Sequence, residues 1–534
     1  MRLIIILLLA LGICFRFVNL DHKVYWFDET FTSLRSAGYT EAEIVQHFAQ
    51  TSVVNAVDLQ QYQQPDRSRG IRDTLYSLAI EDTQHPPLYY VLANVWMRSI
   101  GSSVSAMRLL SVLLSLLVFP CAYWLCWELF VARGAFPFHL PAWIMIGLLA
   151  ISPFQVLYAQ ESRQYGLWSV TTLLATAALL RAVRLNRWAD WGIYALTLTI
   201  GCYTFLFTGL VAIAHGSYIL MLAKFRPTKT AMAYLIASLI GIAAFSPWMG
   251  SLAANLSYVQ TVTSWTGNDL AKSELLRNWI RILGRLFFDQ DSEGNDGNLW
   301  IDRPIKLGSF VLVIGAFYWL CRRTPKSVWL LMITLAGIPF LALALADLIL
   351  GGLRSTYPRY FIPTLLAVQL AVAYLLSVNL VNASSRFQPY WRGIAAIVFG
   401  VGICSCILIS QSQVWWIKIH NTENPAVVQV LQHTAHPLLI SDAKTGDLLS
   451  LSHSLPPTID LVIRPRCSTC HHAGSRGIDP SILQIPEGYE EVFLYHPRAS
   501  KEWRRSLAQM QNYRAELISL NQDKVLWRIV RNLD

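Results

Sequence analysis

Residues 328–350 read VWLLMITLAGIPFLALALADLIL and follow the basic residues Arg322, Arg323 and Lys326. About 20 mostly apolar residues are enough for an α-helix to cross the hydrocarbon core of a bilayer. Lys and Arg are enriched in the cytoplasmic loops of membrane proteins, so the basic cluster also indicates direction. This stretch therefore predicts a membrane-spanning helix that begins on the cytoplasmic side.

Similar apolar runs occur along most of the chain and predict about 11 spans. No small-x-small cleavage site follows the first run, so we expect an uncleaved anchor. Residues 86–100 form a shorter run, which we expect to dip into or lie on the outer leaflet. The fold class is thus a polytopic α-helical membrane protein with a juxtamembrane helix. The other ten predicted spans are residues 3–20, 107–130, 140–158, 166–183, 189–206, 208–223, 231–249, 307–321, 360–381 and 393–413.

The charge balance supports the same interpretation. Of the 534 residues, 54% are hydrophobic and only 14% are charged, whereas 43 Lys+Arg against 33 Asp+Glu give a net charge of +10. This composition excludes a disordered or collagen-like chain and argues against a soluble enzyme. The basic residues gather between spans, so their excess indicates topology and not nucleic-acid binding. The resulting topology has a cytoplasmic N-terminus and an external C-terminus. These basic residues are Arg133, Arg181, Arg184, Arg187, Lys224, Arg226, Lys229, Arg322, Arg323, Lys326, Arg386 and Arg392.

Four segments then share the outer side, namely residues 21–106, 159–165, 250–306 and 351–359. Each has an ordinary explanation when it is considered alone. An acidic pair can lie at a solvated interface, Pro is common in a first helical turn, and arginines can snorkel. However, charged groups at the bilayer boundary are costly unless they are paired or used. Their recurrence at the outer ends of several helices favours one common cleft.

The residue types in these segments suit group transfer. A carboxylate can act as general base toward a hydroxyl group. One arginine can donate two parallel hydrogen bonds to two oxygens of a phosphate. Arginines would also stabilise the charge that develops on a leaving phosphate. The chain has no Gly-x4-Gly-Lys-Ser/Thr loop, so an ATP-type donor is not supported. We therefore expect a donor that is carried on a lipid phosphate.

Several motifs together resemble one family pattern. They are Asp28-Glu29 after the first span, His85-Pro86-Pro87-Leu88, Arg108-Leu109, the turn AQESRQY at 159–165, and Arg359-Tyr360 with Pro363. Over roughly the first two-thirds of the chain, this set resembles the C-type integral-membrane glycosyltransferases. The most similar branch is the bacterial branch of the protein O-mannosyltransferase family, with the lipid A aminoarabinose transferases as relatives.

The resemblance implies a polyprenyl-phosphate-linked sugar donor and an inverting transfer to a hydroxyl acceptor outside a bacterial-type plasma membrane. It implies that Asp28 is the general base and that Glu29 supports it or contacts the acceptor. The acceptor would be a lipid, a glycan or a protein. Loop 250–306 is too short for the β-trefoil domain of the eukaryotic enzymes, which weakens the case for a protein acceptor. No cofactor is required, although a divalent cation could take part.

The resemblance also implies binding roles for further residues. His85 and Arg108 would lie near the donor phosphate or order the first loop. Glu161 and Arg163, with Tyr165, would line the sugar or acceptor pocket. Arg359, with Tyr360, would hold the lipid phosphate, and Arg354 is an additional candidate.

Loop 250–306 contains an amphipathic stretch at residues 276–288. Its spacing predicts a helix in the headgroup layer, which would either gate donor entry or serve as a passive anchor. The acidic run at residues 289–296 lacks the final Glu of an EF-hand, so we expect a flexible loop. The predicted apolar face is Leu276, Trp279, Ile280, Leu283, Leu286 and Phe287, and the basic face is Arg277, Arg281 and Arg285.

Residues 414–534 are more polar and predict a small external α/β domain beside the membrane-embedded domain of residues 1–413. The expected helices are residues 425–435 and 500–515, and the expected strands are residues 437–441, 491–495 and 524–530. An acceptor-binding or a stabilising role is consistent with this domain.

Cys467, Cys470 and His471 have the spacing of a c-type haem attachment site. The surrounding sequence lacks a cytochrome-like helical pattern, and the second Cys/His pair of a zinc site is missing. We therefore expect a local disulfide or a thiol pair.

Two other functions fit a polytopic chain. A transporter or lipid flippase would place polar sites near the midplane and often show internal repeats, neither of which the sequence displays. An inactive scaffold of the same fold is the other alternative.

Overall fold

The computed structural model describes residues 2–49, 53–136, 139–290, 299–381, 387–418, 420–470, 488–489, 491–496, 513–520 and 523–531. The chain forms two compact units. The first, the membrane unit, comprises Met1–Leu20, Gln84–Tyr89 and Arg108–Gln411. The second, the sheet unit, comprises Asp21–Thr83, Tyr90–Met107 and Ser412–Asp534.

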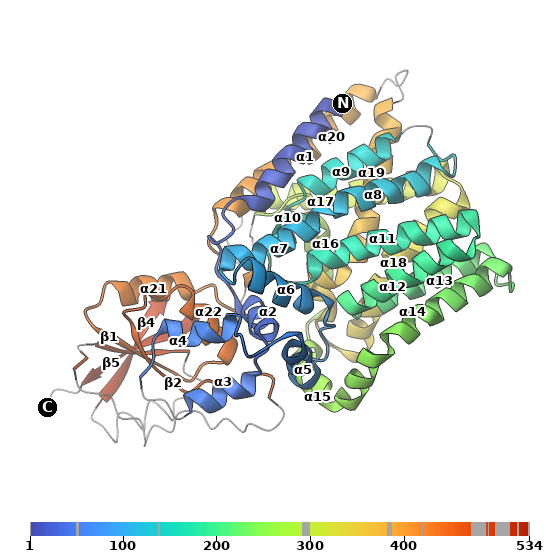
Figure 1. Ribbon diagram of the computed structural model, residues 1–534. Helices are drawn as coiled ribbons and strands as arrows, with labels where there is room; N and C mark the ends of the chain where they lie inside the picture. The colour runs from blue at the N-terminus through green and yellow to red at the C-terminus, as the bar shows by residue number, and fades with distance from the viewer. Residues whose placement is uncertain are drawn as a thin grey trace. The chain divides into compact units, whose positions relative to one another are not determined.

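The membrane unit is built of helices, several of which run side by side (Figure 1). Two helices, α6 (Leu88–Ser99) and α7 (Val104–Leu116), contribute residues to both units. The remaining helices are α1 (Arg2–Phe17), α8 (Val118–Cys126), α9 (Leu140–Ala150), α10 (Pro153–Ala159), α11 (Tyr165–Leu185), α12 (Trp188–Thr204), α13 (Thr208–Leu222), α14 (Lys229–Ala254), α15 (Leu256–Val262), α16 (Lys272–Arg285), α17 (Leu299–Arg323), α18 (Lys326–Leu350), α19 (Ile362–Val381) and α20 (Gln388–Gln411).

Within the described residues, 7 helices are long and apolar enough to cross a membrane, or 8 if the bent pair α9–α10 is one span. This confirms the predicted polytopic α-helical membrane protein. Helices α1, α12 and α13 coincide with predicted spans but have only 16, 17 and 15 residues. The total of about 11 spans remains a prediction.

A buried arginine stabilises the break between α9 and α10. The two helices are bent by 62°, and Pro153 opens the second one. Such a break leaves carbonyl groups at the end of α9 without helical partners. Arg16 of α1 donates hydrogen bonds to the carbonyl oxygens of Leu149 at 2.9 Å and Ala150 at 2.7 Å. The arginine therefore replaces the missing backbone donors at this point.

The sheet unit contains a five-stranded mixed sheet of order β2-β1-β3-β5-β4. Strand β1 (Pro437–Ser441) is parallel to β2 (Asp460–Ile463) and β3 (Glu491–Tyr495). Strand β5 (Asp523–Arg531) is antiparallel to both β3 and β4 (Tyr513–Leu520). The predicted small α/β region is thus confirmed. The strands expected at residues 437–441, 491–495 and 524–530 correspond to β1, β3 and β5.

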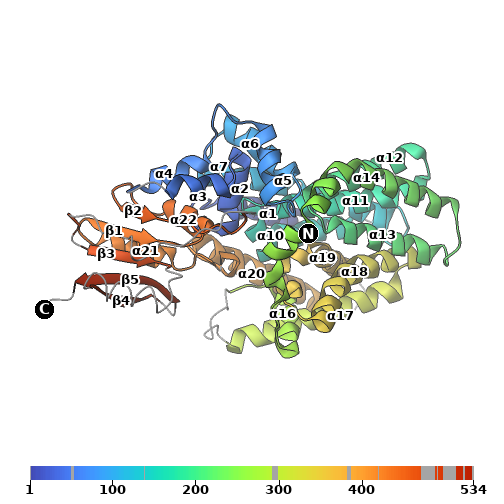
Figure 2. The ribbon, with the colours of Figure 1, turned by 90° about the horizontal axis from the view of Figure 1, so that it is seen from below.

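Helices from both ends of the chain cover one face of this sheet (Figure 2). The first loop supplies α2 (Phe27–Ala37), α3 (Glu41–Phe48), α4 (Ala56–Gln60) and the turn η1 (Gln61–Gln63), and it also carries α5 (Ile71–Glu81). The C-terminal segment supplies α21 (Asn424–Gln432) and α22 (Thr445–Ser452). Their apolar side chains share one core with the inner face of the sheet. The loop after the first helix and the C-terminal region therefore fold as one unit.

The predicted C-terminal boundary of one helix was wrong. Residues 513–515 begin strand β4, whereas a helix was expected over residues 500–515. Cross-strand pairing from Tyr513 opposite Arg531 to Leu520 opposite Asp523 determines this conformation. Residues 500–512 lie outside the described residues, as do residues 291–296 of the acidic run and His471.

Candidate active site

The acidic pair lies in the first turn of α2, in the sheet unit. Asp28 is half-buried, whereas Glu29 is fully buried. The carboxylate of Glu29 accepts a hydrogen bond from Lys418 Nζ at 2.7 Å, and both side chains are at most 1% exposed. Acidic residues are favourable in a first helical turn because of the helix dipole. The two neighbouring carboxylates thus have different surroundings.

Helix α2 begins at Phe27 without a side-chain cap from the preceding residue. Trp26 has extended backbone angles and makes no side-chain cap hydrogen bond. Instead, the backbone N–H of Phe27 donates to Oδ1 of Asn421 at 2.8 Å. An Asn or Asp oxygen at this position satisfies one of the N–H groups that every helix start leaves open. A residue almost 400 positions away therefore caps the helix that carries Asp28.

The turn at residues 159–165 joins α10 to α11 and is buried in the membrane unit. Within it, Gln160 Nε2 donates to the carbonyl oxygens of Phe15 at 2.9 Å and Val18 at 2.8 Å. Gln160 thereby caps the end of α1, just before the first outer loop. The following Glu161 and Arg163 are buried as well.

Arg163, His85 and Tyr165 lie together. Arg163 Nη2 donates to Nε2 of His85 at 3.0 Å, and its guanidinium lies 5.8 Å from the centre of the Tyr165 ring. His85 precedes α6, at the start predicted from the His-Pro-Pro motif. The structure thus joins two motifs that are 78 residues apart in sequence.

Arg359 completes this group from the turn η5 (Pro358–Phe361). Its guanidinium lies 5.6 Å from the ring centre of Tyr165, 5.2 Å from that of Tyr357 and 5.6 Å from that of Tyr360. Tyr158 interacts electrostatically with both Glu161 and Arg359. Six predicted site residues therefore form one group in the membrane unit, the arginine cluster: His85, Glu161, Arg163, Tyr165, Arg359 and Tyr360.

The other two predicted arginines contact different parts of the membrane unit. Arg108 is buried and donates to the carbonyl oxygen of Leu20 at 2.7 Å. Arg354, in the turn η4 (Arg354–Thr356), forms an ion pair with Asp347 at 3.1 Å and donates to the carbonyl oxygen of Gly351 at 2.9 Å. These contacts connect Arg354 to the end of α18.

Sequence reasoning did not single out Arg285, a buried arginine of the membrane unit, as a site residue. It was placed on the basic face of the predicted interfacial helix, which α16 confirms as a helix. Arg285 is buried, lies 3.6 Å from Asp289 and interacts electrostatically with Tyr158. The phase of the apolar face also differs, since Leu275 is 1% exposed and the predicted Leu276 is 54% exposed. A basic residue followed directly by Leu-Phe-Phe was the available signal.

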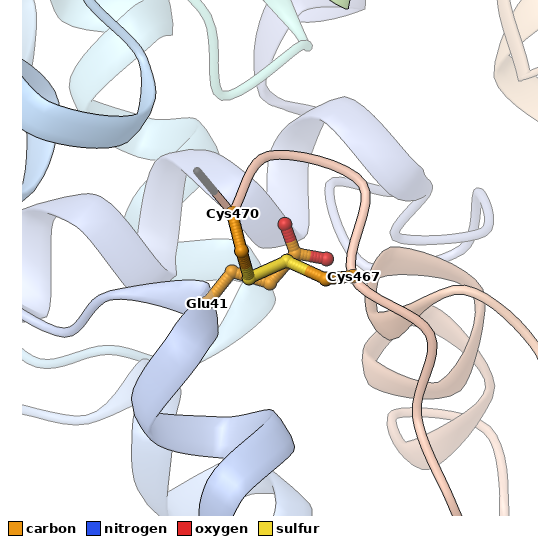
Figure 3. A group of neighbouring side chains, drawn as sticks. All are labelled: Glu41, Cys467 and Cys470. Atoms are coloured by element: carbon orange, nitrogen blue, oxygen red, sulfur yellow. A yellow bond between two sulfur atoms is a disulfide. The ribbon is translucent and has the colours of Figure 1, made fainter. Parts of the chain in front are cut away.

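The predicted local disulfide is present between Cys467 and Cys470 (Figure 3). The carboxylate of Glu41 lies beside it, and its oxygens accept hydrogen bonds from the backbone N–H groups of Ser468 at 2.7 Å and Thr469 at 2.6 Å. Burial raises the pKa of Glu41, while the hydrogen bonds from Thr469 and Ser468 oppose that increase. Glu41 and the two sulfurs are close enough to hold a metal ion, but a metal would need the cysteines as thiolates.

Comparisons with known proteins support the predicted resemblance. The sequence model of the family described as dolichyl-phosphate-mannose-protein mannosyltransferase matches residues 84–250, which include five of the predicted site residues, His85, Arg108, Glu161, Arg163 and Tyr165. No curated protein matches the chain.

Two crystal structures of ArnT from Cupriavidus metallidurans share the fold of this chain. The structure bound to undecaprenyl phosphate has 13% sequence identity and a TM-score of 0.50. The structure in the apo state has 12% identity and a TM-score of 0.52. Each comparison covers 98% of this chain and 97% of ArnT. This chain therefore shares the fold of ArnT over nearly its whole length.

Proposed function

We propose that this chain, which has the fold of ArnT, is a membrane glycosyltransferase that transfers a sugar from a polyprenyl-phosphate-linked donor to a hydroxyl acceptor. The observation that carries the proposal is the arginine cluster, in which Arg163 and Arg359 lie among aromatic rings. Aromatic faces orient a guanidinium, and a guanidinium can bind phosphate oxygens with two parallel hydrogen bonds, so this group suits a phosphate. The ArnT structure with undecaprenyl phosphate supports a lipid phosphate as the ligand.

In the proposed reaction, Asp28 removes the proton from the acceptor hydroxyl as that oxygen attacks the anomeric carbon of the sugar. The bond between the anomeric carbon and the phosphate oxygen breaks, and the polyprenyl phosphate leaves with the bonding electron pair. One displacement inverts the anomeric configuration. Arg163 and Arg359 stabilise the growing negative charge on the leaving phosphate. Asp28 carries the proton at the end of the step.

The remaining site residues have supporting roles in this proposal. Glu161, Tyr165 and Tyr360 line the sugar and donor pocket, and His85 orients Arg163 through their hydrogen bond at 3.0 Å. The site lies outside the plasma membrane, and residues 21–83 of the transferase region fold together with residues 414–534 in the sheet unit. The sugar is a hexose or a pentose, and the acceptor is a lipid, a glycan or a protein.

The test uses the full chain in liposomes, a panel of undecaprenyl-phosphate-linked hexoses and pentoses, and a native envelope extract as the acceptor source. Turnover is counted as released undecaprenyl phosphate. Loss of a general base typically costs about 100- to 10,000-fold in rate. We expect Asp28→Asn to lose turnover by that factor while its affinity for undecaprenyl phosphate stays within twofold of wild type.

The matched control is Asp21→Asn, because Asp21 is an exposed acid in the same outer segment. We expect this variant to retain wild-type turnover. Undiminished release by Asp28→Asn would remove Asp28 as the base. Absence of release from the wild-type chain with every donor would instead favour an inactive scaffold or a transporter.

A further inference from the structure

The first turn of α2 is held by a short segment near residue 420, within the sheet unit. Lys418 ends the turn η6 (Trp416–Lys418), and its Nζ lies 2.7 Å from Glu29 Oε2. The same ammonium lies 5.6 Å from the ring centre of Trp26. Asn421 follows three residues later and caps α2 through the N–H of Phe27. One segment therefore contacts the residues on both sides of Asp28.

The two holding residues also support each other. The backbone N–H of Asn421 donates to the carbonyl oxygen of Lys418 at 3.1 Å. The side-chain Nδ2 of Asn421 donates to Asp447 Oδ1 of α22 at 3.3 Å, which fixes the amide so that Oδ1 faces the start of α2. The orientation of the cap is thus set from a third element of the sheet unit.

Aromatic packing restricts the same turn further. The His420 ring stacks on Trp26 with ring centres 6.3 Å apart and also contacts Phe27 at 5.5 Å. Gly446 of α22 lies so close that a Cβ atom there would clash with the ring of Phe27. The first turn of α2, which carries Asp28, therefore has little freedom to shift along the helix axis or to rotate about it.

A buried ion pair is costly to form, because both charges lose their hydration. The Lys418–Glu29 pair adds a fixed positive charge at the residue next to the proposed base. Its hydrogen bond occupies the Glu29 carboxylate, which is therefore suited to anchoring α2. This arrangement distinguishes the two acids of the Asp28-Glu29 motif.

We propose that Lys418 and Asn421 are positioning residues for Asp28. They fix the first turn of α2 and hold Glu29 through the Lys418 ion pair, so that the Asp28 carboxylate keeps one orientation toward the acceptor hydroxyl. This inference rests on the proposed role of Asp28 as the base. Neither residue contacts the reacting atoms in this proposal; both act through α2.

The test compares Lys418→Met, Lys418→Arg and Asn421→Ala in the liposome assay, with turnover expressed per folded molecule. Misplacement of a catalytic group lowers kcat more than it lowers ground-state binding. We expect Lys418→Met and Asn421→Ala to lower kcat at least 10-fold, with KM for the donor and affinity for undecaprenyl phosphate within twofold of wild type. We expect Lys418→Arg to recover at least half of the turnover, because it keeps the charge.

The matched control is Arg35→Met, which breaks a buried ion pair with Glu81 (2.6 Å) at the other end of α2. It removes a comparably buried charge, so we expect a similar fall in thermal stability but wild-type kcat per folded molecule. Equal loss of kcat in Arg35→Met and Lys418→Met would reduce Lys418 to a general structural role and overturn the proposal. Wild-type kcat in Lys418→Met would overturn it as well.

Two further measurements keep the proposal testable. The first applies if the single variants fold poorly, and the second applies if the chain shows no turnover. The Glu29→Gln/Lys418→Met double variant removes both charges and leaves none unpaired; we expect it to fold with kcat still reduced about 10-fold, and full kcat would contradict the proposal. Hydrogen exchange needs no turnover: Asn421→Ala should speed exchange at residues 27–30 at least 10-fold and leave residues 35–37 unchanged. Unchanged exchange at residues 27–30 overturns the positioning role whatever the activity, whereas an active Asp28→Asn overturns only the proposed base.

Discussion

The two charged regions of this protein are built in different ways. In the sheet unit, charges are neutralised by partners that are distant in sequence, as in the ion pairs Glu29–Lys418 and Arg35–Glu81. In the membrane unit, three tyrosine rings surround the guanidinium of Arg359. An ion pair fixes a charged group through an opposite charge, whereas ring faces fix the plane of a guanidinium. In the proposed function, the first arrangement positions the base Asp28, and the second binds the donor phosphate.

The largest expected change in ligand affinity concerns the membrane unit and contrasts Arg359 with Arg354. Arg359→Ala should weaken binding of undecaprenyl phosphate about 10- to 100-fold, since hydrogen bonds to charged groups contribute about 1.5–3 kcal/mol each. Arg354→Ala should instead leave affinity unchanged and lower thermal stability, because Asp347 loses its ion pair at 3.1 Å. Native mass spectrometry with undecaprenyl phosphate, together with thermal unfolding, measures both quantities. An equal loss of affinity in the two variants would show that Arg359 and Arg354 do not differ in their contribution to phosphate binding.

The sequence predicted the members of the arginine cluster better than it predicted their supports. His85, Glu161, Arg163, Tyr165 and Arg359 stand in motifs at helix ends, and helices bring such ends to one side of a membrane. Gln160 was within one of these motifs, but its role in capping α1 depends on the carbonyl groups of Phe15 and Val18. Helix ends are visible in sequence, whereas the choice of capping partner is a property of the packed structure.

The supports of α2 have no local signature at all. Lys418 and Asn421 stand in the stretch VWWIKIHN at residues 414–421, almost 400 residues after Glu29, and the sheet unit brings them next to α2. The one-residue error between Leu276 and Leu275 has a related cause, because a helical period locates an apolar stripe only to within about one position. Strand β4 was mistaken for the end of a helix because its pairing with β5 outweighs local preference.

The next effect tests the neutralised charges of the sheet unit through pH. Burial raises the pKa of Asp447 to about 6, with Lys444 and the hydrogen bond from Asn421 opposing the increase. A raised acid pKa means that the folded chain binds this proton more tightly than the unfolded chain. Its contribution to stability is therefore present at about pH 4 and is lost as pH rises through about 6, by about 3 kcal/mol.

Asp447→Asn should remove this dependence. We expect the variant to gain stability relative to wild type as pH rises from about 4 to about 7, and to match it at the lower end. Thermal unfolding of the full chain in detergent across this range measures the difference, with the exposed-acid variant Asp21→Asn as the control. A pH-independent difference between Asp447→Asn and wild type would show that the buried carboxylate is not the titrating group.

The smallest expected change in stability concerns the disulfide loop, whose backbone N–H groups donate hydrogen bonds to Glu41. In the chain-entropy account, a crosslink that closes a four-residue loop stabilises the fold by about 2 kcal/mol. Cys467→Ser/Cys470→Ser should lower the stability of the sheet unit by this amount, and a dithiol reductant should produce the same loss in wild type but none in the variant. Limited proteolysis of the region around residue 470 and thermal unfolding measure the loss, with Cys14→Ser as the control because Cys14 is a free, exposed cysteine.

Glu41→Gln separates the two contributions of this loop. If the disulfide acts by holding the N–H groups of Ser468 and Thr469 against the buried carboxylate, the losses from Glu41→Gln and from the cysteine pair should overlap, so that the triple variant loses less than their sum. Strictly additive losses would mean that the crosslink only shortens the unfolded chain. In that case only the ion pairs of α2 would distinguish the charged groups of the sheet unit from Arg359 of the membrane unit. The disulfide would then stabilise the sheet unit independently of Glu41.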